Sequence, residues 1–200
     1  MRVSECVACR DFPCADVLHK NYSVPGVEIN PQYISIMLIS EAAPADLKDG
    51  YYAPGETLFA QTTLQAFNDA GMQVGSVQDI LNLGVYLTSA VKCAKTAYGI
   101  QTDTVRQCAR LLEQELALFP NVRAYLLMGN VAIKAFNMVA QRAAEKRIIP
   151  AGSTYKIRGE SYFFRGRRAF PSYLQAGPSF FIEKSKRKMI AEDIAAALRV

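Results

Sequence analysis

Apolar and polar residues follow different spacings along this chain, and each spacing predicts a type of local structure. Short apolar runs rich in β-branched and aromatic residues predict buried strands over residues 33–40, 85–89 and 122–128. Apolar residues at helical spacing predict helices over residues 56–70, 104–119, 131–146 and 183–199. Strands that alternate with helices predict a mainly parallel sheet covered by helices on both faces.

Residues that favour caps and turns mark several boundaries. Gly71 follows the first helical segment, and Ser76 with Asp79 has the pattern of a helix N-cap. We expect a short helix from Ser76 to Gly84. Residues 153–168 are predicted to form a β-hairpin whose turn lies near residues 158–160.

Ligands of parallel α/β sheets bind beyond the carboxyl ends of the strands. In this chain the ends of the predicted strands are Ser40–Glu41, Ser89 and Met128–Gly129. The candidate site is therefore expected where these segments meet.

Length and composition are consistent with one compact domain. The chain has 200 residues, half of them apolar, which is enough for a substantial core. No apolar run approaches the length of a membrane span, and no signal peptide is evident. We expect a single domain over residues 1–200, with an N-terminal cysteine knuckle at residues 1–20, in a cytoplasmic monomer that does not bind membranes.

Positive charge is concentrated near the C-terminus. The net charge is +5, and residues 156–168 contain five basic residues interspersed with aromatic ones. Basic and aromatic side chains together can contact phosphates and stack on bases, so the segment is a candidate DNA-binding surface. A solvated hairpin with aromatic residues in the core explains the same pattern.

The cysteines form the most distinctive motif. Cys6 and Cys9 form a C-x-x-C pair, and Cys93 and Cys108 are fifteen residues apart. Four such thiolates can hold a [4Fe–4S] cluster or a structural zinc ion. Separate buried thiols are the alternative, and an odd number of cysteines argues against a disulfide framework. Cys14 is expected to lie outside the ligand set.

Motifs across nearly the whole chain resemble the uracil-DNA glycosylase superfamily, most closely its iron–sulfur branch, family 4. These are the C-x-x-C pair, Ile39–Pro44 for the family's G-E-A-P-G segment, Ser89–Cys93 for N-V-V-K-C, Leu126–Gly129, and Phe170–Gln175 for H-P-S-Y-L-L. The resemblance implies a three-layer α/β/α fold around a mainly parallel four-stranded sheet. It also implies a [4Fe–4S] cluster on Cys6, Cys9, Cys93 and Cys108, with zinc as the less favoured occupant.

The same resemblance implies the site residues. Glu41 and Ser89 occupy the catalytic positions, and the base-binding positions are Ala42, Tyr51, Tyr52, Ser89 and Phe170. The implied DNA-binding residues are Arg165, Arg167, Arg168, Pro171, Ser172 and Tyr173.

Three features depart from the family pattern. The glycine-rich first loop of the family has become Ala42-Ala43-Pro44, with a shift of one residue. Ser89 replaces the asparagine that reads the uracil edge, and Phe170 replaces the histidine that assists the leaving base. Phenylalanine can neither donate a hydrogen bond nor carry charge. Glu41 remains, either to orient a water molecule or to brace its loop.

Three functions are therefore open. The first is a monofunctional DNA glycosylase that removes uracil or another deaminated base in base-excision repair. The second is a non-catalytic iron–sulfur protein of the same superfamily that binds DNA or a nucleotide. The third is a zinc-stabilised α/β domain with an unrelated small-molecule site.

Overall fold

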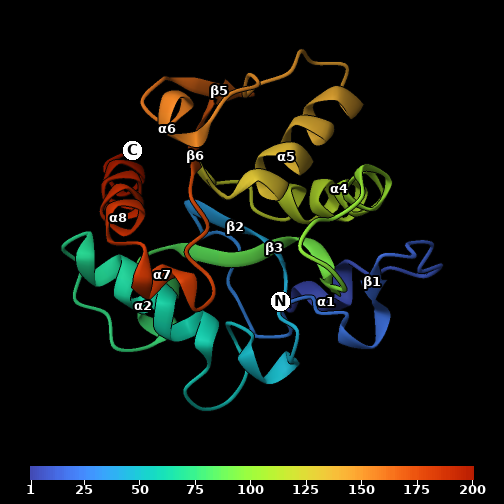
Figure 1. Ribbon diagram of the computed structural model, residues 1–200, viewed down its shortest axis with the longest axis horizontal. Helices are drawn as coiled ribbons and strands as arrows, with labels where there is room; N and C mark the ends of the chain where they lie inside the picture. The colour runs from blue at the N-terminus through green and yellow to red at the C-terminus, as the bar shows by residue number, and fades with distance from the viewer.

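A six-stranded mixed sheet forms the centre of the computed structural model, which describes residues 1–200 (Figure 1). The strands are β1 (Val17–Leu18), β2 (Ile36–Ala43), β3 (Val85–Lys95), β4 (Ala124–Met128), β5 (Tyr162–Phe164) and β6 (Arg167–Ser172). Their order in the sheet is β1-β3-β2-β4-β6-β5. The four central strands are parallel, as predicted, and the short edge strands β1 and β5 pair antiparallel to them.

Helices cover both faces of the sheet. They are α1 (Val3–Cys6), α2 (Leu58–Asp69), α3 (Val77–Asn82), α4 (Thr102–Ala117), α5 (Asn130–Arg142), α6 (Thr154–Ile157), α7 (Ser179–Ile182) and α8 (Lys184–Leu198), with 3₁₀ turns η1 (His19–Asn21) and η2 (Leu47–Asp49). Figure 1 shows α4 and α5 on one face and α2 and α8 on the other. This arrangement confirms the three-layer α/β/α prediction. No helix is long and apolar enough to cross a membrane.

Each face of the sheet has its own apolar core because the central strands are buried on both sides. Tyr86 and Leu127 pack toward α4 and α5, whereas Leu38 and Leu126 belong to the cluster under α2 and α8. All four of these side chains are almost completely buried. Parallel strands buried on both faces read as continuous apolar runs, which explains why their positions were predictable.

Local signals predicted the α3 helix correctly. Ser76 is its N-cap, its hydroxyl accepts from the Asp79 N–H, and the Asp79 carboxylate accepts from the Ser76 N–H at 2.8 Å. This reciprocal pair is a capping box, which satisfies two of the amide donors that every helix start leaves unpaired.

The hairpin predicted over residues 153–168 is wrong in its first half. Residues 154–157 form helix α6, with Thr154 and Ile157 buried, and the hairpin contains only β5 and β6. Its turn lies at Arg165–Gly166, where both residues have positive φ, 51° and 76°. The burial of Thr154 and Ile157 favours the helical turn of α6 over the extended strand that had been predicted there.

Candidate functional site

The strand registers bring the predicted site segments together. Ser40 lies opposite Ser89, and Met128 lies opposite Ser172. The carboxyl ends of β2, β3, β4 and β6 therefore share one edge of the sheet, where three neighbouring cavities open.

A cavity of about 230 Å³ lies beside the ends of β2 and β3. Four of the five predicted base-binding residues line it: Ala42, Tyr51, Tyr52 and Ser89. Residues 23–26 of the N-terminal segment form another wall. Phe59, which the motifs had not indicated, lines this cavity and also a neighbouring one of about 440 Å³.

The two tyrosines are held by their hydroxyl groups. The Tyr51 hydroxyl accepts from Gln175 Nε2 at 2.8 Å, and the Tyr52 hydroxyl accepts from the Leu87 N–H at 2.9 Å. Burial raises the pKa of Tyr51 to about 12 and raises the pKa of Tyr52 further. Both rings are therefore neutral and rigid walls of the cavity.

Phe170 does not line this cavity. Its side chain is 7% exposed and belongs to the apolar cluster beneath α2 and α8. The Arg168 guanidinium lies over its ring at 4.9 Å. The structure therefore gives Phe170 a packing role in the core, apart from the other predicted base-binding residues.

Glu41 lies at the junction of two other cavities, the one of about 440 Å³ and one of about 660 Å³. Its Oε1 atom accepts from the N–H of Val131, in the first turn of α5, at 3.2 Å. A carboxylate at a helix N-terminus is stabilised by the unpaired amides and the helix dipole. The bracing role weighed from the sequence is thus observed, and the second carboxylate oxygen has no hydrogen-bond partner in the protein.

Gly129 permits this arrangement. It has a φ of 99°, which favours glycine, and a Cβ atom there would come within 2.6 Å of Glu41 Oε1. The glycine between β4 and α5 therefore allows both the turn and the close approach of the carboxylate.

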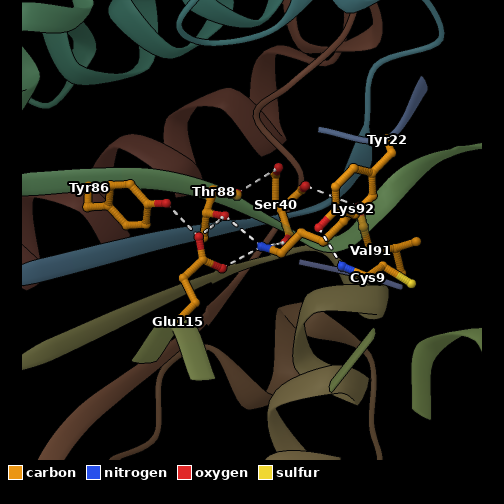
Figure 2. A network of polar contacts seen from close by, with 9 residues as sticks. Cys9, Tyr22, Ser40, Tyr86, Thr88, Val91, Lys92 and Glu115 are labelled. Atoms are coloured by element: carbon orange, nitrogen blue, oxygen red, sulfur yellow. Dashed lines mark hydrogen bonds and ion pairs between the residues drawn. The ribbon is translucent and has the colours of Figure 1, made fainter. Parts of the chain in front are cut away.

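A buried polar network, shown in Figure 2, lies behind the part of β3 that lines the cavity of about 230 Å³. The Lys92 ammonium donates to the Ser89 carbonyl at 2.6 Å and to the Thr88 hydroxyl at 2.8 Å, and it pairs with Glu115. Glu115 also accepts from the hydroxyls of Tyr86 and Thr88, at 2.5 and 2.8 Å. Helix α4 thus fixes the backbone of β3 where Ser89 lines the cavity.

The predicted DNA-binding residues separate into two groups. Tyr173 lines the largest of the three cavities at the carboxyl edge. Pro171 and Ser172 are buried beside it, and the Ser172 hydroxyl donates to Asp193 at 2.5 Å. Burial raises the pKa of Asp193 despite its hydrogen bonds from Arg158 and Ser172.

The three arginines lie at the opposite edge, because they precede or begin β6. Each one makes contacts within the protein. Arg165 pairs with Glu145 at 3.2 Å, Arg167 donates to the Tyr125 hydroxyl at 3.0 Å, and Arg168 lies over the Phe163 ring.

Positive charge at the carboxyl edge comes from three lysines, of which Lys186 belongs to a basic cluster of the sequence at residues 184–188 and the other two had not been indicated. Lys95, Lys134 and Lys186 line the same cavity of about 660 Å³ as Glu41 and Tyr173. They come from β3, α5 and α8, so only the fold brings them together. The Lys186 ammonium lies 5.6 Å from the centre of the Tyr173 ring.

All five cysteines are free thiols. Cys93 and Cys108 are buried, Cys9 and Cys14 are half-buried against the same apolar cluster, and Cys6 is exposed. Burial, with the nearby thiols of Cys108, Cys9 and Cys14, raises the pKa of Cys93 to about 12. No three His, Cys, Asp or Glu side chains stand together as ligands of one metal ion.

Comparisons with known proteins agree with this geometry. The sequence profile of the uracil DNA glycosylase superfamily matches residues 28–194. A relative from Thermus thermophilus, described as a type-5 uracil-DNA glycosylase, is 32% identical over 124 residues. These residues are 61% of this chain and 53% of the relative, so the chain spans about half the length of that protein.

Proposed function

Because the chain belongs to the uracil-DNA glycosylase superfamily, we propose that it hydrolyses the N-glycosidic bond of uracil or another deaminated base in DNA. The observation that carries the proposal is the cavity of about 230 Å³ at the ends of β2 and β3, next to the Glu41 carboxylate. The sequence profile assigns the superfamily. The family 4 branch expected from the motifs remains a prediction, since the relative from Thermus thermophilus is described as type 5.

This cavity of about 230 Å³, called the base-sized cavity below, suits a base flipped out of the DNA stack. Such a base is held between aromatic or apolar walls and is read through the hydrogen-bonding groups on its edge. Tyr51, Tyr52 and Phe59 supply aromatic walls, and Ser89 supplies a hydroxyl group. The hydroxyl of Ser89 donates to the Val91 carbonyl at 3.1 Å, so its oxygen is the atom available to accept from a base.

Glu41 is proposed to orient the attacking water. One carboxylate oxygen is anchored by the Val131 N–H, the other has no hydrogen-bond partner in the protein, and Glu41 lines the two cavities beside the base site. A carboxylate held at one oxygen keeps its orientation while the free oxygen accepts a hydrogen bond from water. The bracing contact therefore supports the catalytic role.

The DNA strand is proposed to follow Lys95, Lys134 and Lys186 along the carboxyl edge. These lysines line the same cavity as Glu41, Tyr173 and Glu183, and the Lys186 ammonium donates to the Glu183 carboxylate at 2.5 Å. Lysines from three separate elements can each neutralise a phosphate of a strand whose flipped base enters the neighbouring cavity.

We further propose that the cysteines around Cys93 and Cys108 hold a [4Fe–4S] cluster with a structural role. The donor set fits such a cluster, because four thiols pack against one apolar cluster between β3, α4 and the N-terminal segment. Each thiolate of a [4Fe–4S] cluster binds a different iron, so the sulfurs stand farther apart than the ligands of one ion. Bound there, the cluster would tie residues 9–14 to the body of the protein.

A non-catalytic DNA-binding protein is the second candidate. The observation that favours it is Phe170, which is buried in the core where the family motif has a leaving-group histidine. Nothing at the base-sized cavity replaces the charge that an imidazole carries.

Base release in a single turnover tests the proposal. Uracil, hypoxanthine and xanthine are placed in defined single- and double-stranded oligonucleotides, and free base is measured with excess protein. We expect release of at least one base, lost in Glu41→Gln and kept in Glu113→Gln, which removes an exposed ion pair with Arg142. DNA binding without release of any base would establish the second candidate instead.

A further inference from the structure

The C-x-x-C motif does not bring its two cysteines to the same place. Cys6 is the last residue of α1, whose buried residue is Val3, and the extended residue Val7 that follows the helix is buried as well. Cys6, which lies between these two valines, is exposed to solvent, whereas Cys9 packs against the core.

The chain reverses between Cys9 and Cys14. Phe12 has a φ of 42°, and its ring packs against His19 and Tyr22 with both centroid distances at 5.2 Å. A positive φ at a bulky residue is uncommon and marks a turn. The Tyr22 hydroxyl also accepts from the Cys9 N–H at 2.9 Å, so Tyr22 contacts both Cys9 and Phe12.

Asp16 then fixes the segment that contains Cys14 to the start of α4. Its Oδ2 atom accepts from the Gln101 N–H at 2.7 Å, and its Oδ1 atom accepts from the Thr104 hydroxyl. Its carbonyl accepts from the Thr96 hydroxyl at 2.9 Å. Residues 14–16 are thereby held over the first turn of α4 and the end of β3.

This anchor places Cys14 next to the two downstream cysteines. Asp16 accepts from the Thr104 hydroxyl, and Thr104 and Cys108 are four residues apart on one face of α4. Cys93 directly precedes Ala94 and Lys95, which pair with Leu18 and Val17 of β1, and the thiols of Cys14 and Cys108 are both near it. Cys14, Cys93 and Cys108 thus meet where α4 crosses the end of β3.

We infer that Cys9, Cys14, Cys93 and Cys108 are the four metal ligands, and that Cys6 is not one of them. The inference rests on the cluster included in the proposed function, and it replaces the ligand set expected from the motif. It also gives Cys14 a role. Each thiol releases its proton when it binds as a thiolate, and no oxidation or reduction of the protein is involved.

The test compares two serine variants of the full chain, purified without oxygen after growth with iron. Cys6→Ser is expected to keep the iron, acid-labile sulfide and visible absorption of the unaltered protein, at about four irons per chain. Cys14→Ser is expected to lose the cluster. Loss in Cys6→Ser with retention in Cys14→Ser would overturn the inference.

A thiol footprint on the unaltered protein does not depend on how the variants fold. The iron-loaded protein is treated with iodoacetamide and the modified cysteines are located by mass spectrometry. We expect modification at Cys6 alone, and at all five cysteines after the metal is removed and the protein unfolded. Modification of Cys14 in protein that keeps its iron would contradict the assignment.

The metal analysis separates this inference from the proposed function. If the protein contains zinc and no iron, the cluster proposal fails, and zinc content of the same two variants still decides between Cys6 and Cys14. Absence of any bound metal from the unaltered protein would overturn both. Base release is not measured in these experiments, so the glycosylase proposal is tested independently of them.

Discussion

The ammonium group of Lys92 and the carboxylate of Glu115 form an ion pair that is completely excluded from solvent. Figure 2 shows how Tyr86 and Thr88 direct their hydroxyls to the same carboxylate. Burying two charges is costly unless their remaining hydrogen-bonding groups are also satisfied, as they are here. This pair connects α4 to the backbone of β3 directly behind Ser89.

Removing one member of this pair should destabilise the fold strongly. Lys92→Met leaves the Glu115 carboxylate buried without its partner, and we expect a loss of about 3–5 kcal/mol in the free energy of unfolding. Lys92→Met with Glu115→Gln removes both charges and keeps an acceptor for the two hydroxyls, so it should cost less than either single change. Urea unfolding of Lys92→Met, Glu115→Gln and the double variant measures the three losses in free energy of unfolding.

An ion pair on the protein surface provides the control for the Lys92 and Glu115 variants. Arg142 and Glu113 form an ion pair at 2.7 Å with both side chains substantially exposed. Exposed pairs contribute about 0–1 kcal/mol. Arg142→Met should therefore have little effect, and a Lys92→Met effect no larger than this would contradict the role given to the buried pair.

Glu41 should show separate contributions to activity and stability. Glu41→Gln keeps an oxygen that can accept from the Val131 N–H, so it should cost less than about 1 kcal/mol of stability while base release is lost. Glu41→Ala should lose both activity and the helix contact. The measurements are single-turnover base release and urea unfolding, and full activity in Glu41→Gln would exclude a catalytic carboxylate there.

Gly129 should be sensitive to the smallest substitution. The added Cβ in Gly129→Ala would contact the Glu41 carboxylate and would require an unfavourable positive φ. We expect base release to fall while DNA binding remains. Gly159→Ala is the matched control, because Gly159 has open space around a Cβ and no positive φ.

Ser89 and Phe170 should respond differently when the family pattern is restored. Ser89→Asn places an amide on the wall of the base-sized cavity, and we expect uracil release to rise by about tenfold, part of the roughly 10²–10³ that one well-placed donor contributes. Phe170→His buries an imidazole in an apolar cluster and should cost roughly 1–3 kcal/mol of stability.

Rates of uracil release and unfolding curves for the two single variants and the double variant test this difference. A large gain in rate from Phe170→His alone would show that the Phe170 side chain reaches the base. A rate lowered by Ser89→Asn would mean that the cavity is not the site of base recognition.

The salt dependence of DNA binding should locate the DNA strand. Substituting alanine for Lys95, Lys134 and Lys186 should reduce the slope of log K against log[salt] by about 0.9 for each phosphate that the protein no longer neutralises. The same change at Arg165, Arg167 and Arg168 is the control, because these side chains lie at the other edge of the sheet. The reverse result would place the DNA on the β5–β6 hairpin, as the sequence had suggested.

The contact between α2 and α8 should depend on pH. Hydrogen bonds from Arg187 lower the pKa of Asp69 below its ordinary value of 3.8. A lowered pKa in the folded state stabilises the fold above the unfolded pKa, and this stabilisation is lost as the pH falls through the folded value. The stability difference between the protein and Asp69→Asn should therefore be largest near neutral pH and shrink below about pH 3.8.

Elements governed by neighbours in the chain were predictable from the sequence. The capping box of Ser76 and Asp79 needs only residues three apart, and the continuous apolar runs of β2, β3 and β4 report burial on both faces. Local bonding and burial of each side chain act over a few residues, so the sequence alone determined the three-layer fold. It did not determine where two strands end: β2 (Ile36–Ala43) and β3 (Val85–Lys95) continue past their predicted ends at residues 40 and 89, so Glu41 lies within β2 and Ser89 within β3.

Tertiary structure decided which distant residues meet. The anchoring of Asp16 on α4 places Cys14 with Cys93 and Cys108, whereas the C-x-x-C motif had favoured Cys6. Lys95, Lys134 and Lys186 converge because three elements end at one edge of the sheet. Such contacts depend on strand order and helix packing, and neither can be inferred from the spacing of residues along the chain.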